Sequence, residues 1–357
     1  MKCRIFITSI FCIYLAALIP LFTQGSDLEF QTPSSIAARI IMNDGFYKLS
    51  MAISQPELGK VFWWIKDSLV EISTQGPLGV AIDDSGNLWI GDESRNAIIK
   101  IYEDQQGYSY TCINSNTYID QPVDFEFMNG KLILLDSGKG TVTVWDNNFN
   151  PAVLLQGLIY PSAMKLVPVT PVADKPNDIA KNSGVRKLHR SGQTTIEDYA
   201  YLYVSNLKQA GSFDTNRPVI HEYYTDLNTV VFQKDFGKNR LELPAGIEIL
   251  DNASLLVLDA HLANIYAFDL ASGLYQWRIG KYGMEPDGWR NPSSVALIGI
   301  CAVIADRGND RITVKAINGD NWRCNSVLEE IEQIAQEIQN RDVKDSHQLT
   351  IVNCEEK

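Results

Sequence analysis

The chain has 357 residues, which is enough for two ordinary domains or for one large repeat domain. Apolar residues make up 45% of it and charged residues 21%, a composition that excludes a wholly disordered protein. Asp and Glu number 43 against 31 Lys and Arg. This acidic balance argues against a nucleic-acid partner, because binding to phosphate backbones depends on neutralisation by Lys and Arg.

The N-terminus has the pattern of a secretory signal peptide. Lys2 and Arg4 precede an apolar run over residues 5–22, and Gly25 supplies a small residue at the expected cleavage point. The run is also long enough for an uncleaved membrane anchor, which is the alternative interpretation. We expect cleavage of residues 1–25, a secreted protein, and no stable membrane insertion afterwards.

Four cysteines remain after that cleavage. An even number in an oxidising compartment predicts disulfides, and three pairings are open. No C-x-x-C pair occurs, so the spacing does not indicate a zinc site. We favour a Cys324–Cys354 bridge, because it would fix the C-terminal tail and stabilise the fold by roughly 3–4 kcal/mol in the chain-entropy model. The four residues are Cys112, Cys301, Cys324 and Cys354.

Comparison of the sequence with itself reveals a unit that occurs five times. Each copy opens with a proline, which is tolerated at the first residue of a strand. A short apolar strand, a tight polar turn and a second, nearly all-apolar strand follow. Successive opening prolines are 45, 39, 83 and 48 residues apart, and the three shorter intervals each match one four-stranded blade. These prolines are Pro77, Pro122, Pro161, Pro244 and Pro292.

The repeat predicts an all-β fold, a six-bladed β-propeller over residues 26–325. The long interval contains residues 168–198, which lack strand periodicity and are interpreted as an insertion in the third copy. A degenerate sixth unit precedes the five, with strands over 46–53 and 60–65 and without an opening proline. Small sheets of this kind cannot bury both faces alone, so the copies are expected to stack around an axis.

Two of the copies resemble the NHL-repeat family. The resemblance is carried by residues 77–92, and by Asn-Pro-Ser-Ser-Val-Ala at 291–296 followed by Ala-Asp-Arg-Gly-Asn-Asp-Arg-Ile at 305–312. It extends loosely over residues 46–320 and implies a secreted six-bladed NHL propeller. That family includes RNA binders, protein binders and lyases, so the fold does not by itself select a function.

The last segment, residues 326–357, is expected to form a helix followed by a tail. Ser326 and Glu329 make a capping box, and the apolar residues after them recur at helical spacing. The helix is expected to pack on the propeller, with a docking helix for a partner as the alternative.

Four acidic residues occupy the same place in four copies, at the end of the second strand. Carboxylates gathered around a central channel would suit calcium or a cationic ligand. The simpler interpretation, which we favour, is that each Asp accepts a hydrogen bond from the backbone of its own turn. His261 follows one of these acids and is a candidate acid–base residue, although a solvated turn residue is the more economical interpretation. The four acids are Asp92, Asp136, Asp259 and Asp306.

The sequence favours a binding module over an enzyme. Zinc-dependent lyases of this architecture use several histidines along the axis, whereas the four histidines here do not fall at equivalent positions in the copies. No G-x-S-x-G motif or P-loop occurs. We expect a non-enzymatic module that needs no cofactor and binds an extracellular protein or a small ligand. The alternative is a calcium-dependent hydrolase or lyase that uses the channel acids.

A glycosylation sequon lies in the fourth copy. It reads Asn252-Ala-Ser254 and falls in a predicted hairpin turn, so a secreted protein would expose it to glycosylation.

Overall fold

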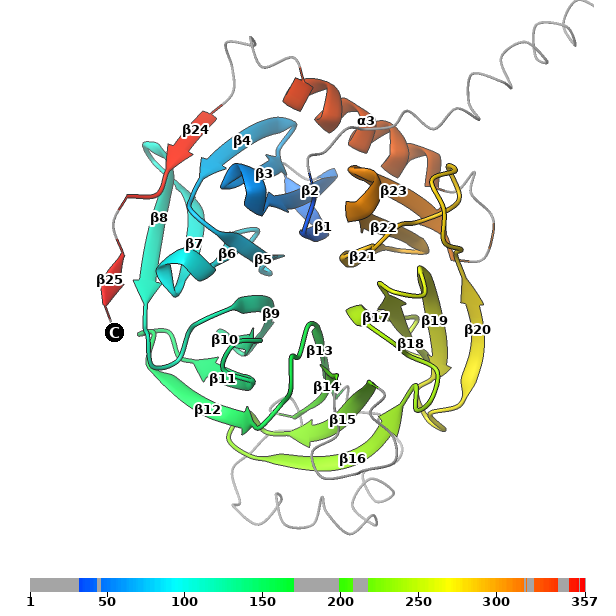
Figure 1. Ribbon diagram of the computed structural model, residues 1–357. Coiled ribbons are helices and arrows are strands. Elements are labelled where there is room, and N and C mark those ends of the chain that lie inside the picture. Colours follow the sequence, from blue (N-terminus) through cyan, green and yellow to red (C-terminus); the bar gives the residue numbers. More distant parts are fainter. Residues whose placement is uncertain are drawn as a thin grey trace, which may run out of the picture.

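The computed structural model describes residues 32–43, 46–169, 199–207, 218–317, 319, 324–339, 347–352 and 354–356. Its strands form six small sheets arranged as blades around one axis (Figure 1). The predicted six-bladed β-propeller is therefore confirmed. The predicted signal peptide lies outside the described residues, as does most of the predicted insertion.

Within the described residues, five blades have four antiparallel strands that run in chain order from the axis to the rim, and the sixth has three. Blades 1 and 2 contain β1 (Ser35–Asn43), β2 (Phe46–Gln55), β3 (Lys60–Ile65), β4 (Ser68–Ser73), then β5 (Pro77–Ile82), β6 (Leu88–Asp92), β7 (Ala97–Asp104) and β8 (Gly107–Asn114). Blades 3 and 4 contain β9 (Pro122–Met128), β10 (Lys131–Asp136), β11 (Thr141–Trp145), β12 (Pro151–Gln156), then β13 (Met164–Pro168), β14 (Ala200–Asn206), β15 (Val219–Thr225) and β16 (Val230–Phe236). Blades 5 and 6 contain β17 (Pro244–Leu250), β18 (Ser254–Asp259), β19 (Asn264–Asp269), β20 (Tyr275–Ile279), then β21 (Ser294–Ile298), β22 (Cys301–Asp306) and β23 (Arg311–Ala316).

The core is divided among the six seams between neighbouring blades. The second strand of a blade is buried on both faces, as the sequence predicted, and every residue of β6 and β22 is buried. An apolar cluster fills each seam. Between blades 2 and 3, for example, the rings of Trp89 and Phe127 lie 5.5 Å apart. Because each sheet buries both faces against its neighbours, the ring must close to complete the core.

The first blade starts earlier than the sequence predicted. β1 pairs with β2 along its whole length and provides the innermost strand of blade 1. It is opened by Pro33, so the prediction that this unit lacks its proline is wrong. The segment 33–37 reads Pro-Ser-Ser-Ile-Ala and matches Pro-Ser-Ser-Val-Ala at 292–296. Alignment of the first copy on β2 hides this match. In the other copies the opening proline precedes the first strand of the blade, whereas β2 is the second strand of its blade.

Three seams are joined near the axis by a repeated hydrogen bond. The acceptor is the side chain two residues after the opening proline of one blade. The donor is a backbone N–H of the following blade, three residues after the opening proline of that blade. This bond links the inner strands directly, independently of the apolar core. The pairs are Val80 N to Ser35 Oγ (3.2 Å), Met164 N to Asp124 Oδ2 (2.8 Å) and Ile36 N to Ser294 Oγ (3.2 Å).

At the other three seams the equivalent residue is small, namely Gly79, Ala163 or Gly246. Between blades 2 and 3 the inner strands approach so closely that a Cβ on Gly79 would lie 2.3 Å from the carbonyl oxygen of Val123. Gly79 therefore permits a backbone approach that no larger residue allows.

A C-terminal segment covers the outer side of blades 6, 1 and 2 (Figure 1). The helix α3 (Asn325–Gln339) packs four apolar residues into the seam between blades 6 and 1, as expected for a helix that packs on the propeller. After it, β24 (His347–Thr350) pairs in parallel with β4, and β25 (Glu355–Glu356) pairs in parallel with β8. The four helical residues are Ile331, Ile334, Ala335 and Ile338.

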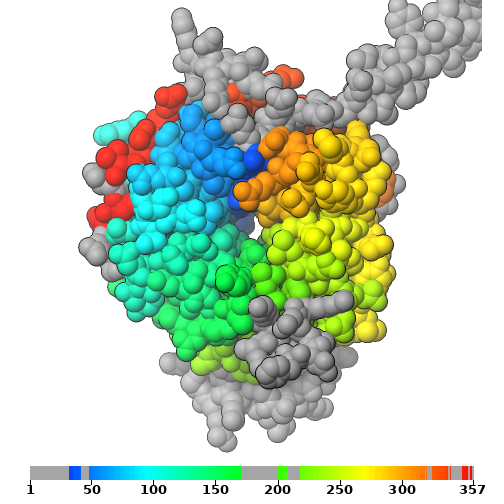
Figure 2. Space-filling view, in the orientation of Figure 1, coloured from blue at the N-terminus to red at the C-terminus, as the bar shows by residue number. Residues whose placement is uncertain are grey.

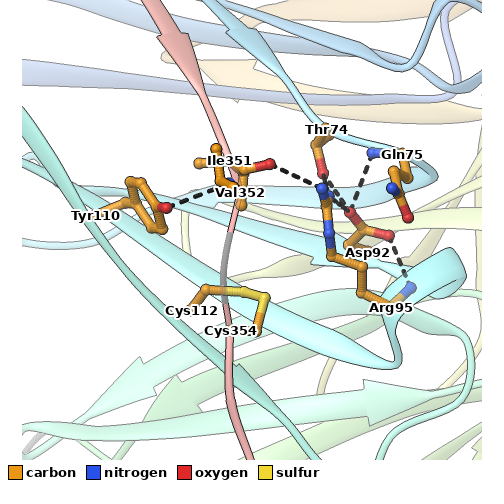
Figure 3. Close-up of a disulfide and its surroundings, with 9 residues drawn as sticks. All are labelled: Thr74, Gln75, Asp92, Arg95, Tyr110, Cys112, Ile351, Val352 and Cys354. Atoms are coloured by element: carbon orange, nitrogen blue, oxygen red, sulfur yellow. Dashed lines mark hydrogen bonds and ion pairs between the residues drawn. A yellow bond between two sulfur atoms is a disulfide. The ribbon is translucent and has the colours of Figure 1, made fainter.

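Two disulfides hold this segment, and their pairing differs from the predicted Cys324–Cys354 bridge. Cys301 bonds to Cys324, and Cys112 bonds to Cys354 (Figure 3). Cys324 lies at the start of α3 beside blade 6, whereas Cys354 lies beside β8 of blade 2. The favoured pairing is wrong because α3 and β24 carry the chain past blade 1 before it reaches Cys354. No described helix has both the length and the apolar character that crossing a membrane requires.

Candidate functional site

The four aspartates singled out from the sequence are fully buried and lie in four different blades. Within the described ranges, no three Asp, Glu, His or Cys side chains are grouped so that they could hold a metal ion. The structure therefore does not bring Asp92, Asp136, Asp259 and Asp306 together into one site.

Each of these carboxylates accepts a backbone N–H bond from the linker before its blade, and all except Asp306 also accept one from the backbone of their own turn. Asp259 accepts hydrogen bonds from the N–H groups of Glu242 and Leu243 in the linker before blade 5, at 2.6 and 3.1 Å. It also accepts bonds from the N–H groups of His261 and Leu262 in the following turn, at 3.1 and 2.9 Å. The carboxylate thus fixes the linker that enters the blade to the turn that leaves its second strand. Asp136 makes the equivalent bonds with Asp120, Gln121 and Lys139.

Two of the four aspartates also bind an arginine. Asp306 lies 2.8 Å from Arg311 Nε, and Asp92 lies 2.8 Å from Arg95 Nη1. Arg95 in turn donates a hydrogen bond of 2.8 Å to the carbonyl oxygen of Ile351 in the C-terminal tail (Figure 3). Asp92 therefore contributes to anchoring the tail on blade 2.

The remaining residues singled out from the sequence lie in exposed turns. The side chain of His261 is 69% exposed, and its Nε2 lies 3.3 Å from Glu242 Oε2. Asn252 is exposed in the turn between β17 and β18, where glycosylation stays a prediction.

The structure shows a different candidate site, a channel along the propeller axis. Its cavity has a volume of about 690 Å³, within the range of small-ligand pockets. It is lined by the innermost strand of every blade, and Figure 2 shows a hollow at the centre of the ring. The lining strands are β1, β5, β9, β13, β17 and β21.

At one level along the axis, the wall of this channel has two chemically different halves. The fourth residue after the opening proline is charged in the consecutive blades 3, 4 and 5. It is alanine in blades 6, 1 and 2. In a ring of six blades each charged residue therefore faces an alanine three blades away. The charged wall is Glu126, Lys165 and Glu248, and the alanine wall is Ala296, Ala37 and Ala81.

The charged wall is a continuous ion-pair chain across two seams. Lys165 Nζ lies 3.2 Å from Glu126 Oε1 and 3.0 Å from Glu248 Oε2. Burial acts to lower the pKa of Lys165, but the two glutamates outweigh it and raise that pKa above its ordinary value. Burial raises the pKa of Glu126, against the opposing effect of Lys165. One ammonium group is thus shared between two carboxylates.

Asp124 adds a third carboxylate beside this chain. It lies two residues before Glu126 on β9, so both project from the same side of the strand. Burial, reinforced by the charge of Glu126, raises the pKa of Asp124 to about 7. Backbone N–H groups of Met164 and Phe125, both at 2.8 Å, and the charge of Lys165 act in the opposite direction and lower this pKa.

Asp124 should make stability depend on pH. Its pKa is about 7 in the folded protein, against an ordinary value of 3.8. The folded protein therefore binds this proton more tightly than the unfolded chain does. The stabilisation is complete below about pH 4 and is lost as the pH rises through 7. As the pH rises from 5 to 8, we expect the unfolding free energy of Asp124→Asn to increase by about 1–2 kcal/mol relative to that of the wild type, allowing for screening by channel water.

Urea unfolding of both proteins at several pH values measures this difference. Asp104→Asn is the matched control, because hydrogen bonds from Ser109 and Gln106 lower the pKa of Asp104 and reverse the sign. A difference between Asp124→Asn and the wild type that does not change with pH would contradict the assignment.

The fold and the axial channel define the protein as a six-bladed β-propeller. No protein-family model and no curated protein sequence matches the chain. Among solved structures, it is similar to a catalytically inactive variant of virginiamycin B lyase from Staphylococcus aureus with quinupristin, at 12% identity and a TM-score of 0.51, over 81% of this chain and 97% of that one. It is also similar to a chain of a nidogen/laminin complex, at 16% identity and a TM-score of 0.50, over 73% and 87% of the two chains. Identities this low establish a shared fold alone.

Sequence reasoning missed the channel residues, although a signal for them was present. In the aligned copies, the fourth residue after the opening proline is charged in three consecutive units and alanine in the others. That change of chemistry at one repeat position was the available indication.

Proposed function

We propose that this protein is a secreted, non-enzymatic binding module of NHL type that holds a small ligand in its axial channel. The observation that carries the proposal is the channel of about 690 Å³, with charged residues on one half of its wall and alanines on the other. The two disulfides support an extracellular location, since such bonds persist in oxidising compartments. The proline-opened blade units support the NHL relation.

The structural neighbours are compatible with more than one kind of partner. One was solved with quinupristin and another belongs to a nidogen/laminin complex, so this fold occurs with both small molecules and proteins. The channel favours a small ligand for this chain, because its polar groups converge on a concave space rather than on a flat surface.

The alternative function is a calcium-dependent hydrolase or lyase. It would need carboxylate oxygens free to coordinate the ion. The buried aspartates at the strand ends instead bind backbone N–H groups and arginines. A rise in Tm with calcium that magnesium does not reproduce would favour this alternative, whereas the binding module is expected to unfold at the same temperature with calcium or with chelator.

Alanine-methyl NMR tests the channel function directly. A panel of small cationic, neutral and anionic compounds is titrated while the methyl signals of Ala37, Ala81 and Ala296 are followed. We expect at least one compound to shift these signals at saturation and to leave those of Ala253 and Ala271, in exposed turns of blade 5, unchanged. A panel that never shifts the channel methyls would overturn the proposal.

A further inference from the structure

The channel wall carries more negative than positive charge. Arg39 and Asp84 form an ion pair with each other. The other lining charges are three carboxylates, those of Asp124, Glu126 and Glu248, and the single ammonium of Lys165, so three minus one leaves a balance of −2 when all are ionised. Uncompensated charge in a partly desolvated wall is unfavourable, and a bound cation would compensate it.

Asp124 is the channel carboxylate that makes no direct ion pair among the described residues, although the charge of Lys165 also acts on it. Lys165 makes its two ion pairs with Glu126 and Glu248. Asp124 accepts its hydrogen bonds from the backbone N–H groups of Met164 and Phe125, and no described Lys or Arg lies within ion-pair distance of it. The site therefore offers an acceptor for a charged donor.

The opposite wall has a different preference. At the level of the charged residues it carries the methyl groups of Ala296, Ala37 and Ala81, each three blades away from a charged residue, while serines and the Arg39–Asp84 pair line this side at other levels. A ligand that spans the channel at this level would meet carboxylates at one side and small apolar side chains at the other. An apolar body on that side gains by leaving water.

We infer that the ligand is a small organic cation with a compact apolar body, of the class of protonated alkylamines. Its ammonium group lies between Asp124 and the glutamates, and its apolar body lies against the alanine wall. This inference rests on the proposed channel function and specifies the chemistry of its ligand.

The test compares three probes with one carbon skeleton: hexylammonium, 1-hexanol and hexanoate. Affinities are measured from the alanine-methyl shifts. We expect hexylammonium to bind about tenfold or more tightly than 1-hexanol, because it adds a charge-assisted hydrogen bond, and hexanoate to bind most weakly. Methylammonium, which lacks the apolar body, should bind more weakly than hexylammonium.

Matched variants assign the effect to the channel. Asp124→Asn should weaken hexylammonium about tenfold and leave 1-hexanol unchanged, whereas Asp104→Asn, the same change at the exposed end of β7, should alter neither. Glu248→Gln removes a channel charge at a second position and should weaken hexylammonium in the same direction, which keeps the test decisive if Asp124→Asn folds poorly.

The pH dependence provides an independent measurement. The charged groups facing Asp124 are Glu126 on its own strand and Lys165 on β13, with Glu248 on β17 beyond, while β5 contributes no charged side chain. Ionisation of Asp124 strengthens the attraction for a cation. Hexylammonium affinity should therefore rise between pH 6 and pH 8, 1-hexanol affinity should stay constant, and Asp124→Asn should flatten the rise.

The outcomes separate the two proposals. If 1-hexanol or hexanoate shifts the channel methyls as strongly as hexylammonium, the cation inference is overturned and the channel function stands. If other compounds of the panel bind there and hexylammonium does not, the inference is likewise overturned. If no compound shifts the channel methyls, both proposals are overturned.

Discussion

Replacing Cys112 and Cys354 together with serine is expected to lower the free energy of unfolding by about 5 kcal/mol. The bridge joins residues 242 positions apart, so it removes much of the conformational freedom of the unfolded chain. It also holds the tail against β8, next to the bond from Arg95 to Ile351. The ring closes at the seam between blades 6 and 1. The tail covers the outer side of blades 6, 1 and 2.

The control for this prediction is the pair Cys301→Ser and Cys324→Ser, whose bridge spans 23 positions. The shorter loop predicts a smaller loss, about 3 kcal/mol. Urea unfolding monitored by tryptophan fluorescence measures both losses. A larger loss for the short loop than for the long one would contradict the role assigned to the tail bridge.

Gly79→Ala is expected to cost at least about 3 kcal/mol and to be among the most damaging single methyl additions in the chain. The new Cβ would lie 2.3 Å from the carbonyl oxygen of Val123 and 2.5 Å from its carbonyl carbon. These are backbone atoms of β9, so relief requires moving the inner strand of blade 3 away from that of blade 2. Such a shift would also change the shape of the channel.

Gly157→Ala separates this overlap from backbone strain. Gly157 has a φ of +82°, and apart from Gly157 itself and its two chain neighbours, no atom of the described residues lies within 4 Å of the position that a Cβ would take there. The substitution therefore adds torsional strain without overlap and should cost about 1 kcal/mol. Urea unfolding of the two variants gives both losses. Comparable losses for Gly79→Ala and Gly157→Ala would show that the inner strands are not in the close contact described above.

The blades could be predicted because their signal is local. An opening proline, an apolar strand, a polar turn and a buried second strand all lie within about twenty residues, and the pattern returns at blade-length intervals. The turn role of Asp259 was predictable for the same reason, since two of its backbone donors follow it within three residues.

The sequence by itself determined the propeller, its repeat and the turn role of three of the four acids that end the second strands; Asp306 instead binds Asn309 and Arg311 through their side chains. Only the tertiary structure decided the first strand of blade 1, the disulfide partners and the channel. The ion pairs of Lys165 join residues 39 and 83 positions away, and Cys112 bonds to Cys354 across 242 positions. Local periodicity fixes which segments become strands, but such contacts depend on where ring closure places segments that are distant along the chain.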